Sequence, residues 1–250
     1  MSQTAPNPGA PLTVVLVHGA CADASSWNGV IERLQAGGVQ MTAPANPLRG
    51  LSYDSAYLAS VFDQIPGPVL AVGHSYAGAV ITNAATKSRN VVGLVYVAAF
   101  APDDGERLGE VEATSKDSVL STALVPLRYP TGQGTETAVE FVINPAYFHD
   151  TFAADLPAEQ ATVMAATQRP VAELAFSEPS EAPAWKTLPT WAVVASGDKA
   201  AGSDVIRSMA QRAGATITEV EGSHVIMISQ PQVVADVILR AVASIATGSA

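Results

Sequence analysis

Four uninterrupted apolar runs limit the folds open to this 250-residue chain more than any other feature of its sequence. They cover residues 12–17 (LTVVLV), 69–72 (VLAV), 91–100 (VVGLVYVAAF) and 190–195 (TWAVVA). Such runs are typical of strands buried on both faces, as in a parallel sheet. Segments of helical periodicity, such as 26–36 and 52–65, separate them, and this alternation predicts right-handed β–α–β crossovers. With shorter strands near 39–43 and 215–220, we expect an α/β fold with a doubly wound, mostly parallel sheet of about six strands and helices on both faces.

The alternation stops between Asp103 and Lys186. This stretch has scattered Pro and Gly, short helical patterns near Ala138 and over 156–168, and no run typical of a buried strand. We therefore divide the chain into an α/β core of residues 12–102 and 188–246 and an inserted, largely helical cap of residues 103–187. Residues 1–11 and 247–250 are expected to be a flexible leader and a flexible tail.

Nearly all of the net charge of −10 belongs to the insertion, where 14 acidic and 5 basic residues compare with 9 and 8 in the rest of the chain. No cluster of Lys and Arg occurs, which argues against nucleic acid and anionic membranes as partners. Acidic surfaces usually serve solubility. A sharper hypothesis is that this acidic cover repels anionic ligands and favours neutral or cationic ones.

The cysteine content and the N-terminal sequence indicate in which cellular compartment the protein is expected. Cys21 is the only cysteine, so the chain has neither an intramolecular disulfide nor a cysteine-based zinc site. The first residues, MSQTAPNPGAP, lack the basic and apolar segments of a signal peptide. No apolar run reaches the roughly 18 residues that span a membrane. These features predict a cytoplasmic protein.

The stretch 68–88 has the pattern of a nucleophile elbow. An apolar strand runs into Gly73-His74-Ser75-Tyr76-Ala77-Gly78, and an Ala- and Val-rich helical segment follows. So sharp a turn crowds the residues two before and two after the serine, and Gly73 and Ala77 are both small. An ordinary strand-to-helix loop also fits this short pattern, so the partners of Ser75 must decide.

A serine hydroxyl needs a base, and the expected sheet supplies candidates at its carboxyl edge, where ligands of parallel sheets bind. His224 follows the strand near 215–220 and is the candidate general base. Asp198 follows the strand 190–195 and is the candidate acid that orients the imidazole. Asp103 and Asp104, which follow the strand 91–100, are the fallback acids.

The backbone can supply an oxyanion hole beside Ser75. The N–H groups of Tyr76, directly after the serine, and of Ala20, after the first strand, are the expected donors. Gly19 would let this first loop approach closely. Cys21 adjoins the loop and is expected to be a small buried residue rather than a catalytic thiol.

Three motifs of the chain resemble the α/β-hydrolase superfamily, in particular small bacterial esterases and the plant methyl esterase/hydroxynitrile lyase group. They are VLVHGACADASSW, GHSYAG and VEGSHVIMISQP, and the resemblance covers about residues 12–102 and 188–240. It implies the α/β-hydrolase fold, the order Ser, acid, His, and a variable cap in the insertion. Ala77 stands where the family usually has Gly. Gly19 and Val225 stand where the lyases carry Thr and Lys, which favours hydrolysis over cyanide chemistry.

These features predict a serine hydrolase without cofactor or metal, most simply a carboxylesterase whose partner is a small to medium, largely apolar ester. Gly19, Phe100 and Trp185 are candidate substrate-binding residues. A lactonase, amidase or thioesterase would use the same triad. A hydroxynitrile-lyase-like or perhydrolase activity, or a ligand receptor without turnover, would also be compatible with these residues. The sequence does not decide between a monomer and a homo-oligomer.

Overall fold

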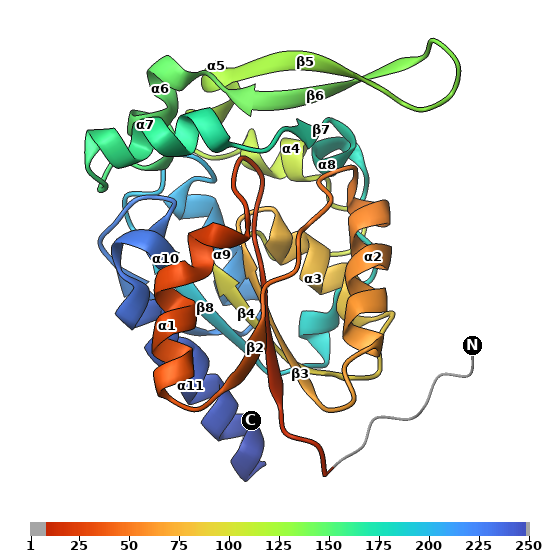
Figure 1. Cartoon of the computed structure of the whole chain (residues 1–250), viewed down its shortest axis with the longest axis vertical. Helices are drawn as coiled ribbons and strands as arrows, with labels where there is room; N and C mark the ends of the chain where they lie inside the picture. The colour runs from red at the N-terminus through yellow and green to blue at the C-terminus, as the bar shows by residue number, and fades with distance from the viewer. Residues whose placement is uncertain (1–8, 249–250) are drawn as a thin grey trace.

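A six-stranded parallel sheet forms the centre of the molecule (Figure 1), as the sequence predicted. The computed structural model describes residues 9–248. The strand order is β2-β1-β3-β4-β8-β9, and every neighbouring pair in this sheet is parallel. The strands are β1 (Thr13–Val17), β2 (Gln40–Thr42), β3 (Val69–His74), β4 (Val91–Val97), β8 (Thr190–Ala195) and β9 (Thr216–Val220). Every residue of β3 and β8 is buried, which explains why these strands are continuous apolar runs in the sequence.

Helices cover both faces of this sheet. On one face α1 (Asn28–Ala36), preceded by the 3-10 turn η1 (Ala24–Trp27), packs against α11 (Pro231–Thr247). On the other face α2 (Leu51–Asp63) packs against α3 (Ala77–Ala85). Two further helices follow the last strands: α9 (Ser203–Arg212) and the short α10 (Ile226–Ser229). No helix within residues 9–248 is long and apolar enough to cross a membrane.

The predicted leader and tail fall mostly outside the described part of the chain, which begins at residue 9 and ends at residue 248. Thr247, assigned to the flexible tail by the sequence, instead ends α11. Gly248 follows it with a φ of +65°, the left-handed conformation that commonly terminates helices.

The insertion lies between β4 and β8 and contains a second sheet as well as helices. Its elements are α4 (Leu108–Glu112), α5 (Leu120–Ala123), β5 (Leu124–Pro130), β6 (Thr137–Ile143), α6 (Pro145–Phe152), α7 (Ala158–Thr167), β7 (Val171–Ala172), α8 (Leu174–Ser177) and η2 (Ala184–Lys186). The antiparallel sheet β5-β6-β7 corrects the prediction of a largely helical cap, and the helical pattern near Ala138 belongs to β6. No residue of β5 is fully buried, so this strand leaves no apolar run to recognise. Its two prolines occupy an edge strand, where a missing N–H is tolerated.

The insertion covers the carboxyl edge of the central sheet, and the β5–β6 hairpin projects beyond the core (Figure 1). Polar contacts attach it to core loops. The Arg49 guanidinium binds Glu140 at 2.9 Å, and Arg169 donates to the carbonyl oxygen of Asn46 at 3.0 Å. Any group at the carboxyl edge of the sheet therefore lies beneath the insertion.

Candidate active site

Ser75 lies in the sharp turn between β3 and α3, in a strained conformation. Its φ is +55°, in the left-handed region that non-glycine residues rarely adopt. Neighbouring backbone holds it there. The Ser75 N–H donates to the carbonyl oxygen of Val97 at 3.3 Å, and the Ser75 carbonyl accepts from the Phe100 N–H at 3.2 Å. The end of β4 thus fixes the turn that presents the serine hydroxyl.

Two glycines make this arrangement sterically feasible. A side chain at position 73 would begin 2.7 Å from the carbonyl oxygen of Ala77, so only glycine fits there. A side chain at position 19 would begin 2.7 Å from Cβ of Ser75. Gly19 therefore lets the loop after β1 lie directly against the serine, although Gly19 itself does not border the cavity described below.

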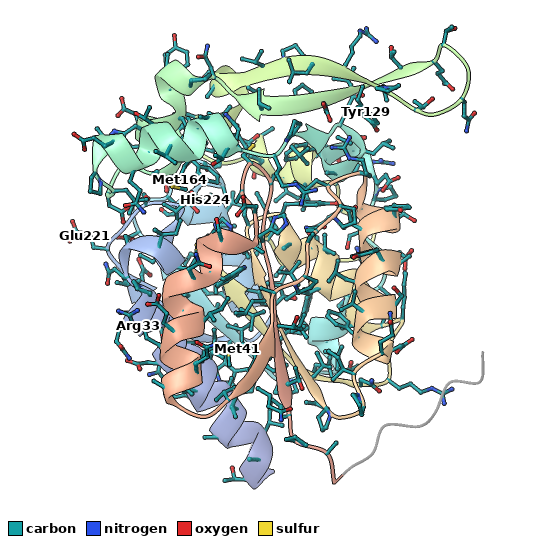
Figure 2. The ribbon with its side chains drawn as sticks, viewed as in Figure 1. Arg33, Met41, Tyr129, Met164, Glu221 and His224 are labelled. Carbon is teal, nitrogen blue, oxygen red and sulfur yellow. The ribbon has the colours of Figure 1, made fainter. Side chains whose placement is uncertain are left out.

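His224 and Asp198 form a buried pair at the ends of β9 and β8. Nδ1 of His224 lies 2.8 Å from Oδ2 of Asp198, and both side chains are only 1% exposed. The other carboxylate oxygen accepts the N–H groups of Ala200 and Ala201, each at 2.9 Å. With both oxygens occupied, the carboxylate has a fixed orientation and holds the imidazole with Nδ1 toward it. Figure 2 shows His224 directly beneath the insertion.

Sequence reasoning missed two residues that hold the His224 loop. Nε2 of His74 donates to the carbonyl oxygen of His224 at 2.9 Å, and burial holds the pKa of His74 well below its usual value. Asp155, from the insertion, accepts the Ser223 N–H at 2.9 Å and also accepts the Ser223 hydroxyl. His74 adjoins Ser75 in the elbow motif, so its place was visible. Asp155 has no signal in the sequence, because its role depends on how the insertion folds.

Ala20 and Tyr76 both line the cavity described below, and within residues 9–248 the backbone N–H of neither residue donates a hydrogen bond to another protein group. The loop that carries Ala20 is fixed through His18. Nε2 of His18 accepts the Asn46 N–H at 2.9 Å, and the His18 carbonyl accepts the Asn46 side-chain amide at 3.1 Å. Burial lowers the pKa of His18 to about 4, so the ring is neutral and can accept at neutral pH.

Cys21 follows Ala20 and is buried, with a φ of +56°. Burial raises the pKa of its thiol to about 12. The thiol therefore stays protonated at neutral pH and lacks the thiolate character that a nucleophilic cysteine needs.

One small cavity brings these groups together. The core contributes Ser75, His224, Tyr76 and Phe100 together with small residues, and the insertion contributes only apolar side chains. The complete lining is Ala20, Cys21, Ser75, Tyr76, Phe100, Leu120, Leu124, Ile143, Phe152, Phe176, Ala200, Ala201 and His224. Its volume of about 20 Å³ is room for little more than one water molecule. In this structure the cavity therefore has no room for a ligand much larger than water.

Other predicted residues lie elsewhere. Trp185 does not line the cavity; its Nε1 donates to the carbonyl oxygen of Pro102 at 2.9 Å at the base of the insertion. Asp103, a fallback acid, binds Nζ of Lys186 at 2.5 Å, away from His224. Asp104 is exposed, and its N–H donates to the Asp103 carboxylate.

A larger groove of about 350 Å³ lies between the segment 22–29 and α7, where Val163 and Met164 contribute side chains. It contains none of Ser75, Asp198 and His224, and only Cys21 borders both the groove and the cavity. Size alone therefore does not identify the candidate site, because Ser75 and His224 line the smaller cavity.

Three solved structures with the same fold are named as an esterase, a methylesterase and a pyrethroid hydrolase. Polyneuridine aldehyde esterase superposes with a TM-score of 0.77 at 20% identity, over 92% of this chain and 99% of that one. The methylesterase MES16 from Arabidopsis gives 0.74 at 21% identity, over 93% and 99%. A pyrethroid hydrolase from Sphingobium faniae JZ-2 gives 0.74 at 19% identity, over 95% and 100%. No curated protein matches the chain by sequence.

A sequence model of the alpha/beta hydrolase family matches residues 14–237, which include both halves of the core and the whole insertion. The fold, the strand order and the position of the insertion agree with this match. The chain belongs to the α/β hydrolase family.

Proposed function

We propose that this protein is a cofactor-free serine hydrolase that cleaves carboxylic esters through an acyl-enzyme on Ser75. One observation carries the proposal. One cavity is lined by a serine on a strained elbow, by a histidine paired with a buried carboxylate, and by Ala20 and Tyr76, whose N–H groups donate to no protein group within residues 9–248. Nucleophile, base and oxyanion stabilisation are the three requirements of acyl transfer.

In the first half of the reaction, Oγ of Ser75 attacks the ester carbonyl carbon and His224 takes the hydroxyl proton on Nε2. Nδ1 of His224 faces Asp198 at 2.8 Å, so the carboxylate stabilises the imidazolium that forms. The N–H groups of Ala20 and Tyr76 stabilise the tetrahedral oxyanion. The intermediate then collapses, the bond to the alcohol oxygen breaks, and His224 gives its proton to the departing alcohol.

In the second half, water attacks the acyl carbon and His224 takes a proton from that water. Collapse of the second tetrahedral intermediate breaks the bond to Oγ, and the proton returns from His224 to Ser75. The products are a carboxylic acid and an alcohol. Apart from the ester and one water molecule, neither half of the reaction needs a group from outside the chain.

The lining of the cavity favours a neutral, apolar acyl group. All five side chains that the insertion contributes are apolar: Leu120, Leu124, Ile143, Phe152 and Phe176. The acidic surface of the insertion adds a repulsion for anionic substrates. The names of the structural neighbours, an esterase, a methylesterase and a pyrethroid hydrolase, favour an ester over a cyanohydrin.

An acyl-chain-length series of aryl esters tests the proposal. Wild-type protein should turn over the short and medium members, and Ser75→Ala should reduce kcat by about a thousandfold or more. A fluorophosphonate probe should label the wild-type protein. Ser60 is an exposed serine on α2, and the control variant Ser60→Ala should be labelled as fully as wild type. At low salt a neutral butyrate ester should outperform the matching anionic hemisuccinate ester, and added salt should narrow the gap.

A ligand receptor without turnover would give a different result. If wild type resisted the probe as completely as Ser75→Ala, the proposed function would be wrong. Equal turnover by wild type and Ser75→Ala would exclude Ser75 as the nucleophile.

A further inference from the structure

The core buries a second carboxylate close to the site, and the reaction above does not use it. Asp54, in the first turn of α2, is fully buried. Oδ2 accepts the hydroxyl of Tyr76 at 2.8 Å, and Oδ1 accepts the backbone N–H of Arg49 at 3.0 Å. A buried carboxylate is costly unless its oxygens are hydrogen-bonded, and here both oxygens are. Burial raises the pKa of the Asp54 carboxyl and that of the Tyr76 phenol.

Tyr76 joins this carboxylate to the reacting centre. It directly follows Ser75, it lines the catalytic cavity, and its N–H is one of the two candidate oxyanion donors. The backbone around it is strained at Ser75, and strained residues persist only where their surroundings fix them. A backbone N–H and the side chain of the same residue share one Cα. Fixing the phenol hydroxyl therefore limits how far the N–H can swing.

We propose that Asp54 is a positioning residue, which holds the Tyr76 N–H in the oxyanion hole by binding the Tyr76 hydroxyl. The inference rests on the proposed function, because an oxyanion must form for the position of this N–H to matter. Asp54 touches no reacting atom and acts through Tyr76. It completes the support of the hole: Asn46 holds the Ala20 loop through His18, and Asp54 holds the other donor.

The other bond to Asp54 connects it with the insertion. The Arg49 guanidinium binds Glu140 on β6 at 2.9 Å and the carbonyl oxygen of Pro170 at 3.0 Å. It also lies 4.5 Å from the centre of the Tyr129 ring on β5. Figure 2 shows Tyr129 on the hairpin, well away from His224. The hairpin therefore fixes Arg49, the residue whose N–H supports Asp54. Glu140 and Tyr129, the hairpin residues that contact Arg49, do not themselves line the cavity.

The chain offers a matched control for the Tyr76 hydroxyl. Tyr96 on β4 is also 1% exposed, and its hydroxyl lies 2.6 Å from Oγ1 of Thr82. It does not line the catalytic cavity. Tyr76→Phe and Tyr96→Phe thus each remove one buried hydroxyl with one side-chain partner, and only the first adjoins the nucleophile.

The experiment is a double-mutant cycle that measures the hydrolysis of an aryl ester. Each rate is divided by the concentration of active sites, which is the amount of protein that a fluorophosphonate labels at completion, so that unfolded protein is not counted. Tyr76→Phe should lower kcat by about tenfold to a hundredfold with KM changed less than about threefold, because misplacing a transition-state donor removes stabilisation that the ground state lacks. Asp54→Asn should lower kcat by a factor in the same range. The double variant should lose little more than the worse single variant. Tyr96→Phe should lower the thermal midpoint and leave kcat within about twofold of wild type.

Two results would overturn the inference. One is a kcat for Tyr76→Phe equal to that of Tyr96→Phe. The other is a double variant whose fold-loss of kcat equals the product of the fold-losses of the two single variants. Such a result would mean that Asp54 acts independently of Tyr76. The wild-type reaction with the probe, measured first, tests the proposed function, and the ratios of variant to wild type test this inference. The two failures are therefore distinguishable.

Discussion

The core and the insertion contribute to the candidate site in different ways. The core supplies the polar groups, and each is fixed by hydrogen bonds inside buried structure: Asp198 and His224 are 1% exposed and Asp54 is fully buried. The insertion supplies only apolar side chains to the cavity, yet it carries most of the net charge on its surface. The difference suggests a division of work. Under the proposed function, the core would determine the rate of the chemical steps and the insertion would determine which substrate fits.

Polar contacts between the two regions limit this division. Asp155 of the insertion holds the loop of His224 through Ser223, and Glu140 binds Arg49 beside Asp54. These contacts bind the loops that carry or support the reacting groups. Substitutions at such contacts should affect kcat, whereas substitutions in the apolar lining should affect substrate choice.

The largest expected effect belongs to the core. Asp198→Asn keeps the shape of the side chain but removes the charge that orients and stabilises the His224 imidazolium. We expect kcat for an aryl ester to fall by about 10³- to 10⁴-fold with a small change in KM. Steady-state kinetics, with circular dichroism to confirm folding, measures this.

Asp103→Asn is the control, because this carboxylate binds Lys186 at the edge of the insertion. It should leave kcat within about twofold of wild type. If Asp103→Asn were severe and Asp198→Asn mild, the acid would belong to the insertion, and the division between the two regions would fail.

The core was readable from sequence because its strands are buried on both faces. The predicted strand 190–195 is β8 residue for residue, and α2 begins and ends within two residues of the predicted 52–65. Because Ser75, Asp198 and His224 each follow one of these strands closely in the sequence, they could be predicted to lie together at the carboxyl edge of the central sheet. Ser75, His224, Ala20 and Tyr76 line one cavity, with Asp198 hydrogen-bonded to His224.

The strands of the insertion could not be predicted from sequence because they lack this burial on both faces. Its strands are partly exposed and gain their pairing from one another, so burial leaves no continuous apolar run. Supporting residues such as Asp54 and Asp155 were missed because their partners, Tyr76 and Ser223, are distant in sequence. Trp185 was expected near substrate on its aromatic character alone, and its indole N–H is occupied by Pro102.

Histidines in the core and in the insertion extend the comparison to pH. The pKa of His18 in the core is lowered by burial to about 4, whereas the unfolded chain has the ordinary value of about 6.5. Between these values the unfolded state binds more protons, so stability is complete above about pH 6.5 and falls as the pH drops toward 4. His18 alone should cost about 3 kcal/mol over this range, and His74, whose pKa is also lowered by burial, should add to it.

Urea midpoints at pH 7.5 and 4.5 measure this loss. His18→Gln should reduce the difference between the two pH values, since the titrating group is gone and the amide oxygen can still accept the Asn46 N–H. His149 on α6 of the insertion is only partly buried, and a hydrogen bond to the carbonyl oxygen of Leu156 raises its pKa. His149→Gln should therefore not reduce the acid-induced loss. A variant His18→Gln with the full wild-type loss would contradict the assignment.

The smallest expected effect belongs to the insertion and sharpens the comparison most directly. Leu124, at the start of β5, lines the catalytic cavity, whereas Leu127 on the same strand is 41% exposed and does not. Leu124→Ala enlarges the cavity on the side of the insertion. It should raise kcat/KM for longer acyl chains over short ones by about tenfold, the scale set by one or two methylenes in an apolar pocket. Leu127→Ala should leave the chain-length profile unchanged. If instead Leu124→Ala lowered kcat equally for every ester, the apolar lining would be positioning the reacting groups, and selection of substrate could not be assigned to the insertion alone.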